Sequence, residues 1–148
     1  MGPFKEGWTE ADVEAALARG IPDELLYIPI VVGMNSDSVD RVWAENMCLT
    51  LANHPHMQTR CNAMTGLGHI ARVCGKLSLD RVLPAISVAL ADRNEEIRGY
   101  AEDAACDIHH YLGVVTPGYD PAHTEAHYEL LRTTAETLIR RAHGEDET

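Results

Sequence analysis

Apolar residues recur every three to four positions in several separate stretches of the chain, which is the period of an α-helix. This spacing predicts antiparallel helix pairs at about 9–19 with 22–33, 37–53 with 57–76, and 79–91 with 95–112. A last helix is expected over about 121–143, followed by a disordered tail, 144–148. We therefore predict an all-α fold of six or seven helices with no sheet, in a single domain that spans residues 1–148.

Several residues mark the ends of the first two helices. Thr9 and Asp12 form a variant capping box, and Gly20 stands where a left-handed residue commonly ends a helix. Pro22 fits the first turn of the next helix, where its missing N–H group costs nothing. Pro29 lies inside that helix, so we expect a kink or a break there.

Two of the predicted helix pairs have similar sequences. Residues 49–71 align with residues 87–109 at a spacing of 38 residues, with one residue of slack in the turn between the helices. Arg60 then corresponds to Arg98, and an alanine follows three residues later in both copies. An internal repeat of this length is typical of helical-hairpin arrays, which have periods of about 33–47 residues.

On these residues the chain resembles the HEAT repeat family over roughly residues 37–113, about half its length. The resemblance implies a short α-solenoid of about three helical hairpins plus a C-terminal helix. Residues 9–33 would be the N-terminal capping hairpin, and residues 37–76 and 79–113 would be the repeats, stacked because one hairpin cannot bury its apolar face alone. The recurrent arginines are expected to bind repeat turns, for example through Asp92.

Acidic residues outnumber basic ones and are unevenly distributed. The net charge is −11; residues 1–50 contain nine acids and three bases, residues 51–100 four and six, and residues 101–148 ten and three. This balance argues against a nucleic-acid partner, which needs a basic surface. Two interpretations stay open, a generally acidic surface that aids solubility and an acidic flank that binds a basic protein.

The sequence favours a soluble, cytoplasmic protein without a membrane partner. The longest uncharged run, residues 25–36, is shorter than the roughly 20 residues needed to span a bilayer, and the first residues lack the apolar segment of a secretory signal. The four cysteines have no CxxC spacing, and we expect no disulfides; they fit small buried apolar positions better.

No complete catalytic or metal-binding motif is present in the sequence. Gly66 and Gly68 only superficially resemble a phosphate-binding loop, and close helix packing explains them better because they fall inside a helix. His123 and His127 stand one helical turn apart, as two zinc ligands would, but no third ligand accompanies them. We therefore expect no cofactor and no metal, although the sequence leaves zinc binding by the two histidines undecided.

The second helices of the repeats carry the candidate binding residues, because in HEAT solenoids these helices line the concave surface. Ala101, Ala104, Ala105, Ile108 and Leu112 are predicted to face the core, which turns small and polar residues outward. The candidates are Glu102, Asp103, Cys106, Asp107 and His110 on the later helix, and Met64, Thr65 and Arg72 on the earlier one.

The resemblance implies a protein that binds another protein stoichiometrically and has no catalytic activity. Within the family, the chain looks like the small, acidic, cytoplasmic immunity proteins of bacterial contact-dependent or polymorphic toxin systems, which block toxins that are often basic nucleases. Two alternatives stay open. One is a HEAT-like enzyme or ligand-binding protein, similar to a DNA glycosylase or a bilin lyase, although a glycosylase would need a basic, aromatic-lined groove. The other is a scaffold protein of a larger assembly.

Overall fold

The computed structural model describes residues 2–144, apart from the side chains of residues 124, 125, 127 and 128. Every regular element in that range is a helix, which confirms the all-α prediction for this part of the chain. The helices are α1 (Glu10–Arg19), α2 (Pro22–Leu25), α3 (Ile28–Met34), α4 (Arg41–Leu51), α5 (Met57–Cys74), α6 (Leu79–Leu90), α7 (Glu95–Leu112) and α8 (Pro121–Ala142). The predicted disordered tail falls almost entirely on residues 145–148, outside the described residues.

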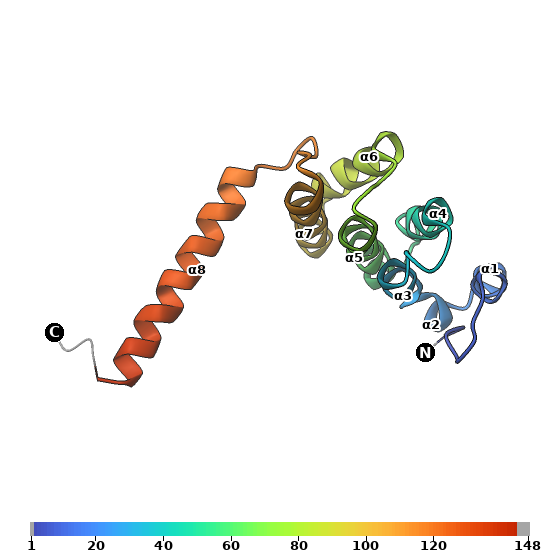
Figure 1. Ribbon diagram of the computed structural model, residues 1–148, viewed down its shortest axis with the longest axis horizontal. Coiled ribbons are helices and arrows are strands. Elements are labelled where there is room, and N and C mark those ends of the chain that lie inside the picture. Colours follow the sequence, from blue (N-terminus) through green and yellow to red (C-terminus); the bar gives the residue numbers. More distant parts are fainter. Residues whose placement is uncertain (1, 145–148) are drawn as a thin grey trace.

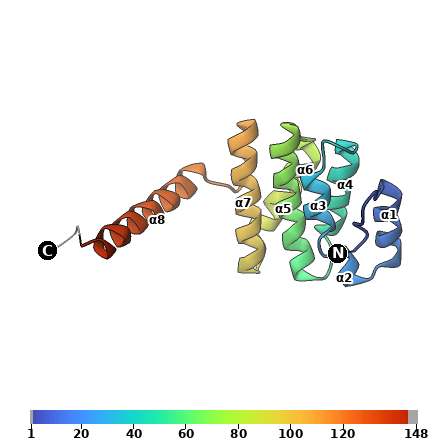
Figure 2. The same ribbon diagram turned by 60° about the horizontal axis from the view of Figure 1, so that its bottom comes forward.

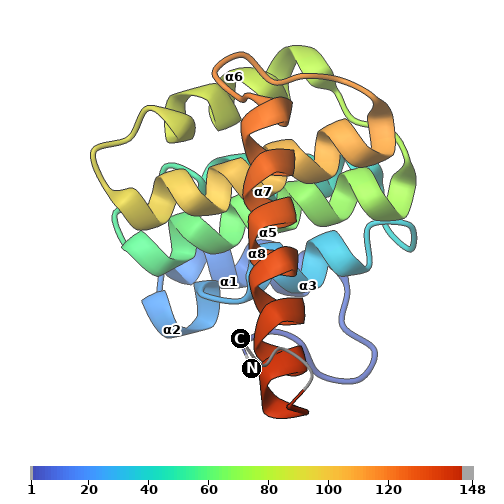
Figure 3. The same ribbon diagram turned by 90° about the vertical axis from the view of Figure 1, so that its left-hand side faces the viewer.

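The helices form two layers and one projecting arm. Helices α3, α5 and α7 lie side by side, and α4 and α6 cover one face of that layer (Figure 1). Helices α1 and α2 lie at the N-terminal edge of the stack (Figure 2). Helix α8 leaves the stack beyond α7 and runs across the direction of α3, α5 and α7 (Figure 3). None of the described helices is both long and apolar enough to cross a membrane.

Helix α5 lies at the centre of the core because it packs against α3, α4 and α7. Six of its apolar residues are almost completely shielded from solvent; they are Cys61, Ala63, Met64, Leu67, Ile70 and Ala71. The neighbouring face of α7 is also buried, through Ile97, Ala101, Ala104, Ala105 and Ile108. The predicted inward face of α7 is thereby confirmed for Ala101, Ala104, Ala105 and Ile108, while Leu112 at the end of the helix is only partly buried.

The predicted helix 22–33 is interrupted, and the interruption lies earlier than Pro29. Helix α2 ends at Leu25 and α3 begins at Ile28, so Pro29 falls in the first turn of α3, where a missing N–H group breaks no helical hydrogen bond. The carbonyl of Leu26, left without a helical partner, accepts a hydrogen bond of 2.7 Å from the buried amide of Asn62. Helix α5 thus stabilises the break between α2 and α3.

Two glycines let α3 approach α5 closely. A Cβ atom on Gly66 would lie 2.4 Å from the carbonyl oxygen of Pro29 and 2.7 Å from the Sγ atom of Cys48. A Cβ atom on Gly33 would lie 2.6 Å from the carbonyl oxygen of Gly66. Only residues without a side chain fit these two positions, so close helix packing accounts for Gly66 as predicted.

The capping box predicted for α1 is present. The carboxylate of Asp12 accepts a hydrogen bond of 2.8 Å from the main-chain N–H of Thr9, and Gly20 ends the helix with φ of 68°. Both features satisfy polar groups that the ends of a helix leave without intrahelical partners.

The predicted start of the helix 37–53 is wrong by four residues. Residues 35–37 form a turn instead, and the hydroxyl of Ser36 donates to the carbonyl of Gly33 at the end of α3 over 2.7 Å. Helix α4 begins at Arg41, because Asp40 caps it by accepting a hydrogen bond of 2.9 Å from the N–H group of Trp43.

A buried glutamate connects α4 with the start of α6. The side chain of Glu45 is fully buried, yet it accepts hydrogen bonds from Arg41, from Arg81 over 2.8 Å and from the main chain of Ser78 over 3.0 Å. Burial alone would raise the pKa of Glu45, but the Ser78 hydrogen bonds and the charge of Arg41 outweigh it, so the pKa lies below its usual value. The buried charge is therefore compensated.

The two repeated arginines converge on one turn. Arg60 of α5 forms an ion pair of 2.6 Å with the carboxylate of Asp92, in the turn between α6 and α7. Arg98 donates instead to the main-chain carbonyl of Asp92 over 2.8 Å and to that of Arg93 over 3.1 Å. The predicted contact between Arg98 and Asp92 is present, but the ion pair that joins consecutive hairpins comes from Arg60.

Candidate functional site

A group of polar side chains lies on the side of α5 and α7 that faces away from the core. We call it the α5–α7 face and define it by His69 and Arg72 of α5 and by Asp103, Asp107 and His110 of α7. Successive members of each helix are three or four residues apart, so each set shares one helical face. Together they place two carboxylates beside one guanidinium group and two imidazoles.

Gly68 allows the two helices to bring these groups together. A Cβ atom on Gly68 would lie 2.7 Å from Oδ2 of Asp107, so any larger residue would push the carboxylate away from α5. This positions Asp107 where the charges of His69 and Arg72 act on it. Sequence reasoning attributed Gly68 to close packing but did not predict that the packed group would be a carboxylate.

The two carboxylates resist ionisation. Partial burial is the main cause that raises the pKa of Asp107, and the charges of His69, Arg72 and His110 offset only part of the effect. Partial burial also raises the pKa of Asp103, and the neighbouring carboxylate of Asp107 raises it further. A cation placed beside either carboxylate would stabilise its ionised form, because an opposite charge favours ionisation.

His69 does not supply that cation at neutral pH. Burial lowers the pKa of His69, and the charge of Arg72 lowers it further, against the opposing effect of Asp107. Its Nδ1 atom lies 3.3 Å from the guanidinium of Arg72, which can only donate, so this nitrogen accepts the hydrogen bond. Arg72 is therefore the permanent positive charge that faces Asp107 across the two helices, and the face remains short of positive charge.

The structure brings together most of the predicted binding residues, but not all. Thr65 and Cys106 are half-buried and share helical faces with Arg72 and His110, so they border the α5–α7 face. Glu102 turns toward the segment after α7, where it lines a small cavity with Arg98 and other residues.

Met64 is the clear correction among the predicted binding residues. Its side chain is only 2% exposed, because it points toward α4 and α6 and fills the space beneath them. Cys61 and Gly68 of the same helix are buried as well. The reason is that α5 has neighbours on three sides, which leaves a narrower exposed strip than α7 has.

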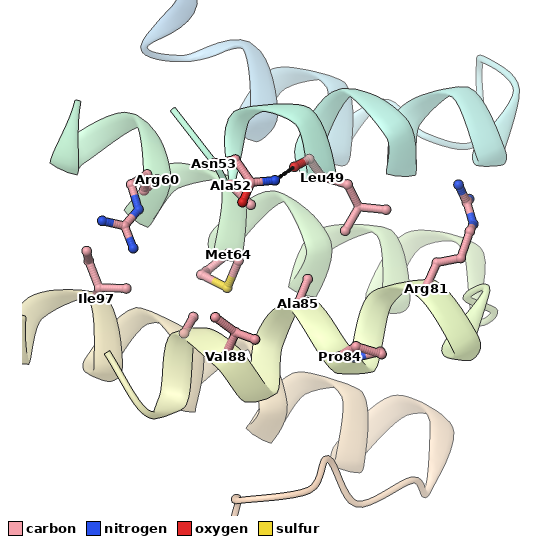
Figure 4. A pocket seen from close by; sticks show the side chains of 11 residues that line it. Leu49, Ala52, Asn53, Arg60, Met64, Arg81, Pro84, Ala85, Val88 and Ile97 are labelled. Carbon is pink, nitrogen blue, oxygen red and sulfur yellow. Dashed lines mark hydrogen bonds between the residues drawn. The ribbon is translucent and has the colours of Figure 1, made fainter. Parts of the chain in front are cut away.

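A cavity that the sequence did not predict lies on the other side of the stack. It has a volume of about 430 Å³ and lies between α4 and α6, with Met64 beneath it (Figure 4). Its lining is mainly apolar and includes Leu49, Ala52, Pro84, Ala85, Val88, Ala89 and Ile97. Val88 is 72% exposed, so an apolar side chain stands in solvent at its edge.

Arginines lie at the two ends of this cavity (Figure 4). Arg60 is paired with Asp92, and Arg81 with Glu45 over 2.8 Å. Since both guanidinium groups already have carboxylate partners, the cavity offers apolar contact more than an anion-binding site. One signal in the sequence could have indicated this cavity. Val88 is an apolar residue on the otherwise solvent-facing side of α6.

The residues described give no further support to a metal site. Within them, no group of three or more histidine, cysteine, aspartate or glutamate side chains lies close enough to hold a metal ion. His123 is exposed at the start of α8, and the side chain of His127 lies outside the described residues, so the predicted pair stays untested. The four cysteines are free thiols.

Comparisons with protein-family models, with curated proteins and with solved structures found no match for this chain.

Proposed function

We propose that this chain is a non-catalytic protein that binds a basic protein partner through the α5–α7 face. The observation that carries the proposal is the pair of carboxylates Asp103 and Asp107, held at the surface with raised pKa values and with too little positive charge around them. A lysine or arginine of a partner would supply the missing charge. Complementary charge of this kind speeds association and selects partners.

The stacked hairpins support a HEAT-like solenoid as the framework of this binding protein. The equivalent helices α5 and α7 lie side by side, as do α4 and α6 on the other layer (Figure 2). Arg60 and Arg98 stand 38 residues apart and both bind the Asp92 turn. A solenoid presents its second helices as one continuous surface, which here is the surface that contains the α5–α7 face.

The more specific form of the proposal is an immunity protein that neutralises a basic toxin, for example a toxin that is a nuclease. It is supported by the net charge of −11, by the acidic last third of the chain and by the resemblance to small HEAT-type immunity proteins. On this proposal the partner's basic active site or an adjoining basic surface would contact Asp103 and Asp107. The chain would act by occupying that surface, without chemistry of its own.

The test compares charge variants in partner binding. A double variant, Asp103→Lys with Asp107→Asn, changes the face while avoiding a long side chain against Gly68. A matched control, Glu6→Lys with Asp37→Asn, makes the same charge change at exposed positions outside the face. Both variants and the wild type would be used to capture the product of the neighbouring gene, and association rates would then be measured over a range of salt concentrations.

We expect the face variant to associate at least tenfold more slowly than the wild type, while the control associates at the wild-type rate. Association of the wild type should slow as salt rises, because screening acts over about 8–10 Å at physiological ionic strength. A partner that binds both variants equally would contradict the role of the α5–α7 face. Toxicity assays with the captured partner would then test the immunity form separately.

The cavity between α4 and α6 favours a second candidate function, the binding of a small apolar ligand. Its volume of about 430 Å³ lies within the usual range of about 300–1,000 Å³ for ligand sites. An Ala85→Trp variant, which would fill the cavity, should abolish the binding of an apolar fluorescent probe without affecting partner binding. If the Ala85→Trp variant still binds the probe, the cavity is not the ligand site.

A further inference from the structure

We propose that α8 pairs in antiparallel orientation with α8 of a second copy of the chain and so forms a two-fold symmetric dimer. This inference concerns a different surface from the α5–α7 face, and it holds or fails independently of the proposed function.

Helix α8 exposes large apolar side chains that the rest of the chain does not cover. Leu130, Leu131, Leu138 and Ile139 are 64%, 52%, 59% and 58% exposed. Figure 1 shows why, since the helix projects away from the stack beyond α7. Four aliphatic side chains gathered on one projecting helix form the kind of exposed apolar patch that marks an interaction site.

The apolar residues form a stripe suited to pairing with another helix. Leu131, Ala135, Leu138 and Ala142 recur at alternating intervals of four and three residues, the spacing that keeps side chains on one face along a helix pair. None of them is charged. Ala135 lies near the middle of the stripe, where a small side chain allows two backbones to come close.

The four exposed aliphatic positions of α8 are symmetric when one copy is turned end for end. Leu130 and Leu131 stand as far before the midpoint between Thr134 and Ala135 as Leu138 and Ile139 stand after it. An antiparallel pair therefore places Leu131 of each copy against Leu138 of the other. A two-fold interface requires this property, because the same patch must serve on both copies.

The charges beside the stripe favour the same orientation. Arg132, which pairs with Glu129 of its own helix, lies beside the stripe four residues before Glu136, and in an antiparallel pair it also comes near Glu136 of the other copy. Parallel pairing would instead bring equal charges to the same height. Antiparallel alignment also opposes the two helix dipoles, which is the favourable arrangement.

Sedimentation velocity of the full chain over a range of concentrations tests the proposal. We expect a reversible dimer whose dissociation constant rises at least tenfold in Leu138→Asp. Thr133→Asp introduces the same charge on the opposite side of α8 and should leave the dissociation constant unchanged. Circular dichroism on each variant checks that α8 remains helical.

Orientation is tested by exchanging the charges. Arg132→Glu alone and Glu136→Arg alone should each weaken the dimer, because each places like charges together at both ends. An equimolar mixture of the two variants should restore dimerisation as a mixed pair, which also shows that neither variant fails to fold. A wild-type chain that stays monomeric, a dimer unaffected by Leu138→Asp, or an Arg132→Glu dimer as tight as wild type would each overturn the proposal.

Discussion

Arg60 and Asp92 join two consecutive helical hairpins through an ion pair of 2.6 Å. The same aspartate receives Arg98 on its main-chain carbonyl, so one turn binds the equivalent arginines of both hairpins. The hydrogen bonds from Asn94 and Arg60 hold the pKa of Asp92 below its usual value. The contact between hairpins is thus electrostatic at this edge and apolar at the core.

Loss of the Asp92 carboxylate should destabilise the fold in a pH-dependent way. Because its pKa is lowered by folding, its contribution is present above the unfolded-state pKa of about 3.9 and is lost as the pH falls through the lower folded-state value. Asp92→Asn should therefore unfold at a lower temperature than the wild type at pH 7. The difference between the two should shrink below pH 4, and a constant difference would contradict this account.

Removing the buried carboxylate should be costly. In Glu45→Ala, the guanidinium groups of Arg41 and Arg81 lose their partner, but they are 22% and 37% exposed and can reach water. We expect a loss of about 3 kcal/mol in the free energy of unfolding, the lower end for a broken buried pair. Urea unfolding measures it. A loss as small as that of an exposed ion pair would show that Glu45 is not the link between α4 and α6.

Two glycine substitutions should have opposite effects. In Gly66→Ala the new methyl group would meet the Pro29 carbonyl at 2.4 Å, and we expect a loss of about 1–3 kcal/mol or more, as in other overpacked sites. In Gly99→Ala no atom lies within 4 Å of the new Cβ atom, so the better helix former should stabilise α7 by about 0.5–1 kcal/mol. Thermal unfolding of both variants checks the contrast in one experiment.

The α5–α7 face should reduce the stability of the fold at neutral pH. The pKa of Asp107 is raised by folding, so its contribution is favourable below the unfolded-state pKa of about 3.9 and is lost as the pH rises through the folded-state value. Asp107→Asn should therefore unfold at a higher temperature than the wild type at pH 7 and at a similar temperature near pH 3.5. A variant less stable than the wild type at pH 7 would show that the interaction with Arg72 outweighs burial.

Core packing between α5 and α7 predicts the effect of enlarging Ala101. This residue is fully buried where the two helices meet. Ala101→Leu should cost about 1–3 kcal/mol, because the interface must open to admit the larger side chain. Urea unfolding measures this loss. If the stability is unchanged, α5 and α7 make their closest contact at another position along α7.

Much of the helical framework could be predicted from local sequence. Thr9 with Asp12 and Gly20 act within one turn of the chain, so their positions sufficed to define α1. The break between α2 and α3 could not be located in the same way, because it depends on Asn62, 36 residues beyond Leu26. A proline indicates that a helix must adjust, but the tertiary hydrogen bond decides where.

The candidate site was predicted less completely, for a similar reason. Helical periodicity correctly placed Asp103 on the exposed side of α7, which has open space there. It failed for Met64, because the exposed width of α5 depends on how many helices surround it. The closeness of Asp107 to α5 follows from Gly68, a contact between positions 39 residues apart that no single-helix pattern contains.

The central position of α5 also constrains the order in which the protein can assemble as it leaves the ribosome. Helices α3 and α4 pack against α5. The carbonyl of Leu26, at the break between α2 and α3, accepts its hydrogen bond from Asn62 of α5. Part of the apolar surface of α3 and α4 therefore stays exposed until α5, which ends at Cys74, has been synthesised. Folding of the N-terminal hairpin is thus expected only after α5 has been synthesised.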